Sequence, residues 1–512
     1  MQQNAYGKDT ALPGAQQKFG FQSVSAVLRP VRFHQFGPGP FGLPGFRLPG
    51  DHGHFPGKLL QRETSKSAPC GNDLCDICTS GDCIRAAERK KEREEREPFF
   101  RITGGQTLRG DIRVHGAKNS VLPIMAASAL CSTPVLLSRV PRLSDTGVSL
   151  RILDSLGCKS ALSGTEAVID ASHISGSRIP DRLVREMRSS VVFLGSVAAR
   201  TGEAFLCLPG GCELGARPID LHLMGLRALG MTIEERGEKL HAYHNGLRGA
   251  EITLPFPSVG ATENILLAAV LADGETVLKG AAREPEIADL CRFLRECGAV
   301  IVGEGSSTLY IEGVRSLHGC SYPVMADRIE AATFLCCTAV CGGDVTVTGF
   351  DPATIGSILT TLREMGCSLQ IYRDSVRIQS DGRLLAPGRI ETAPFPGFPT
   401  DAQPIFMALG CLAKGETVIR ERIFESRFKH LPQFVRMGAD ITVDGQEAVL
   451  HGVERLHGSP LKAMDLRGGA ALVTAALAAE GESRIHGLSH IDRGYERLER
   501  SLQSLGADIS RI

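Results

Sequence analysis

The feature that most constrains the fold is a helix ending that recurs six times. In each copy an apolar helical pattern closes on a glycine, as in Ile152–Cys158 (Ile-Leu-Asp-Ser-Leu-Gly-Cys). The closing glycines are 68 to 73 residues apart along the chain: Gly157, Gly230, Gly298, Gly366, Gly438 and Gly506. A glycine just past an amphipathic helix commonly adopts the left-handed conformation that ends it. The chain from about residue 99 onward is therefore predicted to consist of six copies of one structural unit.

A second recurring element predicts what each unit contains. Short strand patterns follow helices rich in alanine, for example after 265–271 and 470–479. These strands are Gly274–Leu278, Gly343–Val347, Gly415–Ile419 and Gly481–Ile485. Each unit thus reads as helix, strand, helix, strand, with further strands between units. Units of this length are too long for a thin solenoid, so we predict two domains of three units, with the alanine-rich helices buried.

The first 97 residues differ in composition from the rest. Residues 36–57 are dense in Gly, Pro and Phe without helical or alternating periodicity, which predicts a disordered extension. Four cysteines follow within fourteen residues. As thiolates they could bind one zinc ion or an iron–sulfur cluster, and the alternative that they are free thiols is equally supported. These cysteines are Cys70, Cys75, Cys78 and Cys83.

Overall charge and composition exclude several classes of function. The formal net charge is zero, which gives no electrostatic case for nucleic acid or an anionic membrane as partner. No apolar run reaches the length of about 20 residues that spans a bilayer, and the start lacks a signal-peptide pattern. With 16 cysteines and no sign of secretion, a reducing, cytoplasmic location is expected. P-loop, dinucleotide-binding and zincin motifs are missing from the sequence.

One loop combines residues of several chemistries. Between Pro209 and Leu221, glycines and prolines prevent regular structure and predict an exposed loop. Cys212 could donate a proton or act as a nucleophile, and a nearby cation favours its thiolate. Arg217 offers a fork of donors suited to a carboxylate or phosphate. The alternative is a glycine-rich surface loop with an incidental cysteine.

Charged residues also gather where loops lead into helices. Lys118 and Asn119 precede the apolar run 121–130, where free N–H groups favour an anion. The alternative is that Asn119 or Ser120 is a simple helix cap. Asp401 opens another apolar helix as either a cap or a base. Further cations at such junctions suit a small, multiply anionic ligand, although pairing with neighbouring carboxylates would also explain many of them. They include Arg188, Arg467 and Arg493.

Taken together, seven motifs in order resemble the UDP-N-acetylglucosamine 1-carboxyvinyltransferases, a family of enolpyruvyl transferases. The resemblance covers about residues 99–512. The motifs are Gly116–Asn119, Leu208–His222, Phe256–Asn264, Ala281–Ile287, Phe398–Asp401, Met464–Arg467 and His490–Glu496.

The resemblance implies a fold and a reaction. The fold would be an inside-out α/β barrel, with two domains of three β-α-β-α-β-β repeats each. One domain would span 118–325, and the other 99–117 with 326–512. The reaction would transfer the enolpyruvyl group of phosphoenolpyruvate to the 3′-hydroxyl of UDP-N-acetylglucosamine and release phosphate, without a metal or organic cofactor. This is the first committed step of peptidoglycan synthesis.

The resemblance also implies roles for individual residues. Cys212 matches the general-acid thiol, and Asp401 the base or proton relay. The cations around phosphoenolpyruvate would be Lys118, Arg188, Arg217 and Arg493, of which Lys118 and Arg493 are also expected to be catalytic. Arg427 and Arg467 would be electrostatic supports. The nucleotide sugar would contact Asn119, Arg217, Pro218, Ile219, Asp220, Leu221, Ser258, Val259, Asp401 and Ile423.

Two departures and two rivals qualify the resemblance. Gly468 and Gly469 replace larger residues of the family, which predicts a looser helix start, and Ser426 stands where Asn is common. The sister enzyme that makes 5-enolpyruvylshikimate 3-phosphate shares the fold and donor. A paralogue without catalysis is the non-enzyme alternative. The N-terminal residues have no family counterpart, and a misassigned start codon is an alternative explanation for them.

Overall fold

A computed structural model describes residues 97–208 and 219–512 of the chain. The predicted disordered extension, its four cysteines, and Cys212, Arg217 and Pro218 lie outside these residues. Within the two ranges, no helix is long and apolar enough to cross a membrane. The same ranges contain no cluster of three or more His, Cys, Asp or Glu residues suited to a metal ion.

The six-fold repeat predicted from the sequence is confirmed. Each unit contributes one helix that is buried along most of its length. These helices are α2 (Lys118–Ser128), α5 (Phe193–Thr201), α7 (Val259–Ala269), α9 (Arg328–Cys341), α11 (Gln403–Gly410) and α13 (Leu466–Ala478).

Each unit also contributes a more exposed helix that ends just before the repeated glycine. These are α3 (Ser144–Ser155), α6 (Asp220–Ala228), α8 (Pro285–Glu296), α10 (Gly356–Glu364), α12 (Leu431–Arg436) and α15 (Leu498–Ser504). All six glycines have φ between 92° and 99°. This left-handed conformation is strained for residues with a Cβ atom. The recurring glycine is therefore a requirement of the backbone.

The strands form six small sheets in the described part of the chain, one per unit. Three contain the strands of the first half: β13 (Ser321–Pro323), β3 (Val135–Ser138), β5 (Glu166–Asp170), β4 (Lys159–Ser163); β6 (Glu203–Cys207), β8 (Lys239–Tyr243), β7 (Thr232–Arg236); and β11 (Val300–Val302), β12 (Thr308–Glu312), β10 (Glu275–Lys279), β9 (Glu251–Thr253). The other three are β15 (Ser368–Ile371), β16 (Ser375–Ser380), β14 (Gly343–Thr348), β2 (Leu108–Arg113); β17 (Arg389–Glu391), β18 (Glu416–Arg420), β20 (Glu447–His451), β19 (Asp440–Asp444); and β21 (Pro460–Lys462), β22 (Glu482–His486), β1 (Phe100–Thr103), β23 (Asp508–Arg511). Four short helices complete the description: α4 (Asp181–Glu186), η1 (Arg188–Val192), η2 (Pro352–Ile355) and α14 (Leu488–Ile491).

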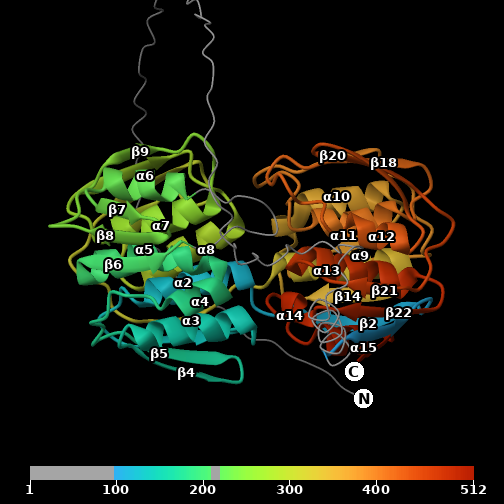
Figure 1. The fold of residues 1–512 in the computed structure, drawn as a ribbon, viewed down its shortest axis with the longest axis horizontal. Coiled ribbons are helices and arrows are strands. Elements are labelled where there is room, and N and C mark those ends of the chain that lie inside the picture. The colour runs from blue at the N-terminus through green and yellow to red at the C-terminus, as the bar shows by residue number, and fades with distance from the viewer. Residues whose placement is uncertain (1–96, 209–218) are drawn as a thin grey trace, which may run out of the picture. The chain divides into compact units, whose positions relative to one another are not determined.

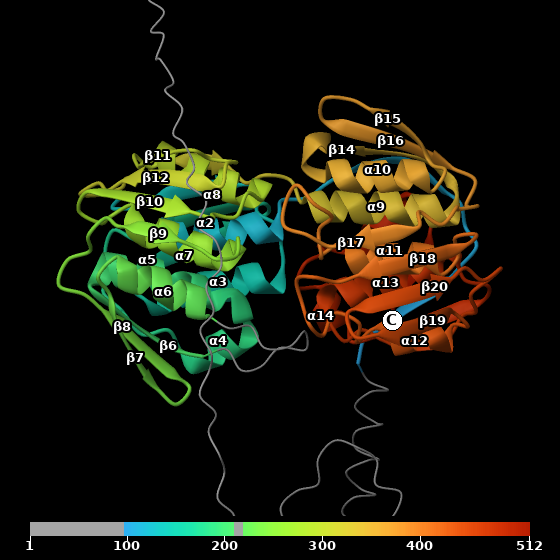
Figure 2. The same cartoon turned by 90° about the horizontal axis from the view of Figure 1, so that it is seen from above.

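In each half the helices lie together inside and the sheets lie toward the outside (Figures 1 and 2). The apolar residues form two separate buried clusters, one from Val121 to Val324 and one from Phe100–Val114 with Ala326–Ile509. The fold is thus the inside-out α/β barrel that the family resemblance implies, with the two domains of three units that the repeat predicts.

The two strands nearest the described start of the chain belong to the second half. β2 runs parallel to β14, and β1 lies between β22 and β23, antiparallel to both. The chain therefore passes between the halves twice, and the two crossing segments hydrogen-bond to each other. Ala117 N–H donates to the Met325 carbonyl at 2.7 Å, and Asp327 N–H donates to the His115 carbonyl at 2.9 Å.

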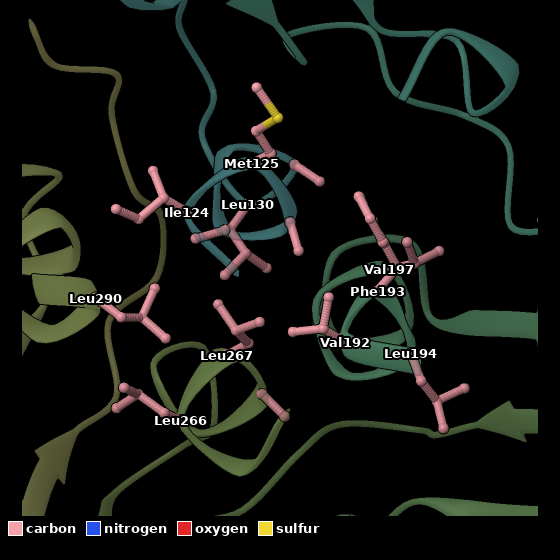
Figure 3. Close-up of a cluster of buried hydrophobic side chains, with 14 of the residues drawn as sticks. Ile124, Met125, Leu130, Val192, Phe193, Leu194, Val197, Leu266, Leu267 and Leu290 are labelled. Atoms are coloured by element: carbon pink, nitrogen blue, oxygen red, sulfur yellow. The ribbon is translucent and has the colours of Figure 1, made fainter. Parts of the chain in front are cut away.

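Packing of the central helices explains why they carry so few polar residues. In the first half, α2, α5 and α7 contribute Met125, Phe193 and Leu267 to one cluster of buried side chains (Figure 3). All three side chains are completely buried. Because these helices have neighbours on most sides, they are apolar on most sides.

The expectation of a looser start for α13 is wrong. A Cβ atom on Gly469 would lie 2.7 Å from Ile491 Cγ1 and 3.0 Å from Ala463 Cβ. A Cβ atom on Gly468 would lie 2.7 Å from Asp465 Oδ2. The two glycines permit close packing of α13 against its neighbours.

This packing predicts opposite effects of one substitution at two helical glycines. Gly469→Ala should lower the free energy of unfolding by about 1–3 kcal/mol because the new methyl group overlaps its neighbours. Gly147→Ala, in α3, meets nothing within 4 Å and should raise stability by roughly 0.5–1 kcal/mol through helix propensity. Urea unfolding of both variants measures the difference. Equal effects at the two positions would contradict the packing argument.

Candidate active site

The helix starts of several units meet at the crossing segments. The first turn of α2 faces the first turn of α9, where Asp327 caps α9 and accepts from Ile329 and Glu330 N–H groups. Its second oxygen accepts from Lys118 N–H at 3.3 Å. A carboxylate of the protein thus lies at the start of α2, and the binding of an anionic ligand there stays a prediction. The alternative that Asn119 or Ser120 caps α2 is wrong, since Ala117 precedes the helix and no side chain caps it.

Asp401 is surrounded by donors rather than capping its helix. Arg467 donates to Asp401 Oδ2 from Nε at 3.2 Å and from Nη2 at 3.1 Å. Arg427 Nη2 lies 3.3 Å from Oδ1, and Asn119 Nδ2 lies 3.4 Å from Oδ2. Helix α11 begins after Ala402 without a side-chain cap. The interpretation of Asp401 as a cap is therefore wrong.

The surroundings of Asp401 fix its charge. Burial acts to raise the pKa of this carboxyl, but Arg467 and Arg427 outweigh burial and hold the pKa well below its usual range. Asp401 is an ionised carboxylate at neutral pH, and its low pKa makes it a weak base while both arginines contact it. Its side chain is 28% exposed, whereas those of Arg427 and Arg467 are 3% exposed. The Asp401 carboxylate is therefore accessible to solvent, while the two guanidinium groups behind it are buried.

The two buried guanidinium groups retain bonding capacity. Among the described residues, Arg427 Nε and Arg467 Nη1 have no hydrogen-bond acceptor. Buried N–H groups without a partner are uncommon and costly. Aromatic rings accompany both cations, since Arg467 lies 5.4 Å from the Tyr495 ring and Arg427 lies 5.7 Å from the Phe424 ring.

A second carboxylate, Asp145 at the start of α3, joins two predicted site cations. Lys118 Nζ lies 2.8 Å from Asp145 Oδ2. Arg493 donates to both oxygens, from Nε at 2.9 Å and from Nη2 at 3.2 Å. Burial acts to raise the pKa of Asp145, but Lys118 and Arg493 together lower it. Burial is also the main reason that the pKa of Lys118 is lowered.

Sequence reasoning missed Asp145 and Glu421. Glu421 is buried and fixes the loop that carries Ile423: its Oε1 accepts from Ile423 and Phe424 N–H groups and from Thr392, and its Oε2 accepts from Thr400. Asp145 lies as far before Gly157 as buried Glu286 lies before Gly298. This shared repeat position was an available signal for Asp145, whereas Glu421 offered none.

The predicted nucleotide-sugar residues lie at helix starts and in one loop. Ser258 caps α7 by accepting from Ala261 N–H at 3.3 Å, and Val259 is the first residue of that helix. Ile219, Asp220 and Leu221 form the start of α6. The described contacts of Ser258 are local, because its N–H donates to Phe256 and its carbonyl accepts from Thr262.

Two other motif residues have structural contacts. Asn264 accepts from Gly195 N–H at 2.8 Å and donates to the Val191 carbonyl at 3.0 Å. Its amide also lies 2.8 Å from His222 Nδ1. Burial lowers the pKa of His222 to about 4. The pair is therefore neutral and links α5, α6 and α7.

A group of buried acidic residues borders the same crossing region. Arg328 of α9 pairs with Glu286 of α8 at 2.9 Å, and both side chains are buried. Glu284 Oε1 accepts from Phe395 N–H at 3.3 Å. Burial, with Glu286 and Glu284 adding repulsion, raises the pKa of Glu263 to about 8. Arg328 is thus the cation beside the carboxyl groups of Glu286 and Glu284. Glu263 is mostly protonated at neutral pH.

Comparison with known proteins gives the family. A model described as EPSP synthase (3-phosphoshikimate 1-carboxyvinyltransferase) matches residues 102–502. The chain is 48% identical over 413 residues to UDP-N-acetylglucosamine 1-carboxyvinyltransferase 2 of Caldanaerobacter subterraneus, covering 81% of this chain and 99% of the relative. It is 50% identical over 415 residues to the UDP-N-acetylglucosamine 1-carboxyvinyltransferase of Maricaulis maris, covering 80% and 98%. The chain belongs to the UDP-N-acetylglucosamine 1-carboxyvinyltransferase family. It is a transferase.

Solved structures agree on the fold. The enolpyruvyl transferase NikO from Streptomyces tendae is 28% identical with a TM-score of 0.74, over 81% of this chain and 99% of that one. EPSP synthase from Acinetobacter baumannii is 20% identical with a TM-score of 0.63, over 81% and 100%. The second likeness supports the fold alone. Each of these likenesses covers 81% of this chain and leaves the remainder without a counterpart in the matched structure.

The raised pKa of Glu263 predicts a pH-dependent stability difference. Below about pH 4.5 the carboxyl is protonated in folded and unfolded chains, so it costs nothing. As the pH rises toward 8 only the unfolded chain ionises, which favours unfolding. The free energy of unfolding of Glu263→Gln should therefore exceed that of the parent by a margin that grows between pH 5 and 8. The margin should reach about 4 kcal/mol and stay constant above pH 8.

Denaturant unfolding at several pH values measures this difference. Glu312→Gln, at an exposed position on β12, is the control and should show no comparable gain across the same range. A constant difference between Glu263→Gln and the parent would mean that Glu263 is ionised in the folded chain.

Proposed function

We propose that this protein transfers the enolpyruvyl group of phosphoenolpyruvate to the 3′-hydroxyl of UDP-N-acetylglucosamine and releases phosphate. The observation that carries the proposal is the assembly of Lys118, Arg493, Arg427 and Arg467 around two carboxylates at converging helix starts. The proposal is supported by 48% identity along almost the whole length of a relative named UDP-N-acetylglucosamine 1-carboxyvinyltransferase 2. The product would enter peptidoglycan synthesis at its first committed step, in the cytoplasm.

The proposed domains are residues 118–325 and residues 99–117 with 326–512, after an extension of about 97 residues. The two separate apolar cores support this division. Both substrates would bind between the domains, and closure would exclude water from the reacting groups. The paired crossing segments at Ala117 and Met325 would be the hinge.

Binding of the donor would use fixed positive charge. Phosphoenolpyruvate carries a carboxylate and a phosphate, and each suits a guanidinium fork or an ammonium group. Lys118 and Arg493 already converge on a carboxylate, which is chemically similar to these groups. Arg188, where η1 begins, and Arg217, in the segment that carries Cys212, would complete the set.

Binding of the acceptor would use Asn119 and Asp401 near the sugar hydroxyl, with Ser258, Val259, Ile423 and the segment from Arg217 to Leu221 along the nucleotide. Asp401 would accept the proton of the 3′-hydroxyl or relay it. Because both arginines depress its pKa, one of these contacts must loosen before Asp401 becomes an effective base.

The chemical step needs an acid as well. A proton added to the methylene carbon of phosphoenolpyruvate makes the adjacent carbon electrophilic, and the sugar oxygen bonds to that carbon. Loss of phosphate and of one methyl proton then restores the double bond. Cys212 would supply the first proton and could also bond covalently to the donor. No cofactor takes part in this scheme.

Two acceptors separate the proposed function from its main alternative, synthesis of 5-enolpyruvylshikimate 3-phosphate. Purified full-length protein with phosphoenolpyruvate should release phosphate when UDP-N-acetylglucosamine is added, and at least about 100-fold more slowly with shikimate 3-phosphate. A colorimetric phosphate assay measures both rates. The reverse preference would select the alternative, and no release with either acceptor would favour a paralogue without catalysis.

The thiol of Cys212 is predicted to be essential. Cys212→Ser should lower kcat by roughly 100-fold or more, since a serine hydroxyl is a much weaker acid. Cys320→Ser, at a half-buried thiol in the first half, is the control and should keep its activity. A phosphonate epoxide of the fosfomycin type should add to Cys212, as peptide mass spectrometry would detect. An adduct on another cysteine would contradict the assignment of Cys212 as the reactive thiol.

A further inference from the structure

Asp145 occupies the two cations that are best placed to bind an anionic donor. Both of its oxygens are engaged, by Lys118 at 2.8 Å and by Arg493 at 2.9 and 3.2 Å. The Asp145 side chain is only 2% exposed, while that of Arg493 is 30% exposed. The buried carboxylate thus lies behind a cation that solutes can reach.

The contact joins the two halves of the molecule. Lys118 and Asp145 belong to the first half, and Arg493 follows α14 in the second half. Two hydrogen bonds from backbone N–H groups lie beside it: Arg142 N–H donates to the Glu496 side chain at Oε2, 2.7 Å away, and Ser144 N–H donates to the Asp492 carbonyl at 3.4 Å. Asp145 therefore holds Arg493 within a continuous contact between residues 142–145 and 492–496.

A carboxylate between two cations is equivalent to a bound anion. An ammonium group and a guanidinium fork are a common setting for a phosphate or carboxylate ligand. A buried negative charge at that place also repels a second anion. A phosphate group can bind there only by displacing the carboxylate from a cation or by overcoming its charge.

We infer that Asp145 is an internal placeholder anion, which occupies Lys118 and Arg493 in the ligand-free enzyme and competes with the anionic donor for them. It is a positioning residue that keeps both cations in place at the expense of donor affinity. The inference rests on the proposed function for the identity of the donor.

A purely supporting role for Asp145 makes the opposite prediction. If the carboxylate only orients Lys118 and Arg493, its removal disorders the cations and weakens anion binding. If the carboxylate competes, its removal strengthens anion binding. The sign of the change in phosphate affinity separates the two roles.

The test uses the full-length protein and inorganic phosphate. Asp145→Asn keeps the size of the side chain and removes its charge. Isothermal titration calorimetry should give a dissociation constant for phosphate about ten-fold lower than that of the parent, or about 1.4 kcal/mol. In steady-state kinetics, KM for phosphoenolpyruvate should fall by a larger factor than kcat changes. Asp145→Glu, which restores the charge, should lose the gain in phosphate affinity.

The matched control is Asp492→Asn. Asp492 is a neighbouring carboxylate that pairs with Arg511 at 2.6 and 2.9 Å, and its substitution should leave phosphate affinity unchanged. Asp145→Ser carries the same expectation as Asp145→Asn, in case the amide variant does not fold.

Unchanged or weaker phosphate binding by the folded Asp145 variants would overturn the placeholder role. That result leaves the proposed function standing if the parent still forms product from UDP-N-acetylglucosamine. If the parent forms none, the proposed function fails, whatever the phosphate titration gives.

Discussion

The site depends on ion pairs between carboxylates and cations that lie close to helix starts and are mostly buried. Asp401 holds Arg427 and Arg467, and Asp145 holds Lys118 and Arg493. Buried charge is stable only when it is paired or hydrogen-bonded. A protein that keeps four cations ready for anionic substrates must therefore supply carboxylates of its own while the substrates are absent. Their geometry limits how tightly a substrate binds and which group can accept a proton.

The inside-out architecture explains how so many charged groups reach one region. The central helices are largely apolar, and the charged site residues that they carry lie in the first turn, as with Lys118 on α2 and Arg467 on α13. The crossing segments bring α2 and α9 together, because Ala117 and Met325 hydrogen-bond to each other. Helix starts also provide free N–H groups, and Asp327 accepts from three of them, on Lys118, Ile329 and Glu330.

Tight packing supports this arrangement at the start of α13. Gly468 and Gly469 suggested a loose helix start beside Arg467, yet their neighbours leave no space for a side chain. In contrast, Glu263 is a buried acid near other acids, and its raised pKa reflects a cost in stability. Residues that cost stability commonly lie at functional sites, and Glu263 lies within a motif of the family.

The sequence by itself determined the repeat, the buried helices and the family, because these are encoded by local periodicity, by six glycines that need positive φ and by ordered motifs. It also suggested the site residues by their place before helices. Only the tertiary structure decided which carboxylate each cation contacts. Asp145 and Arg493 are far apart in sequence, and no local pattern specifies such a pair. The same holds for Asp401, which the sequence left open as a helix cap and the fold directed toward two arginines.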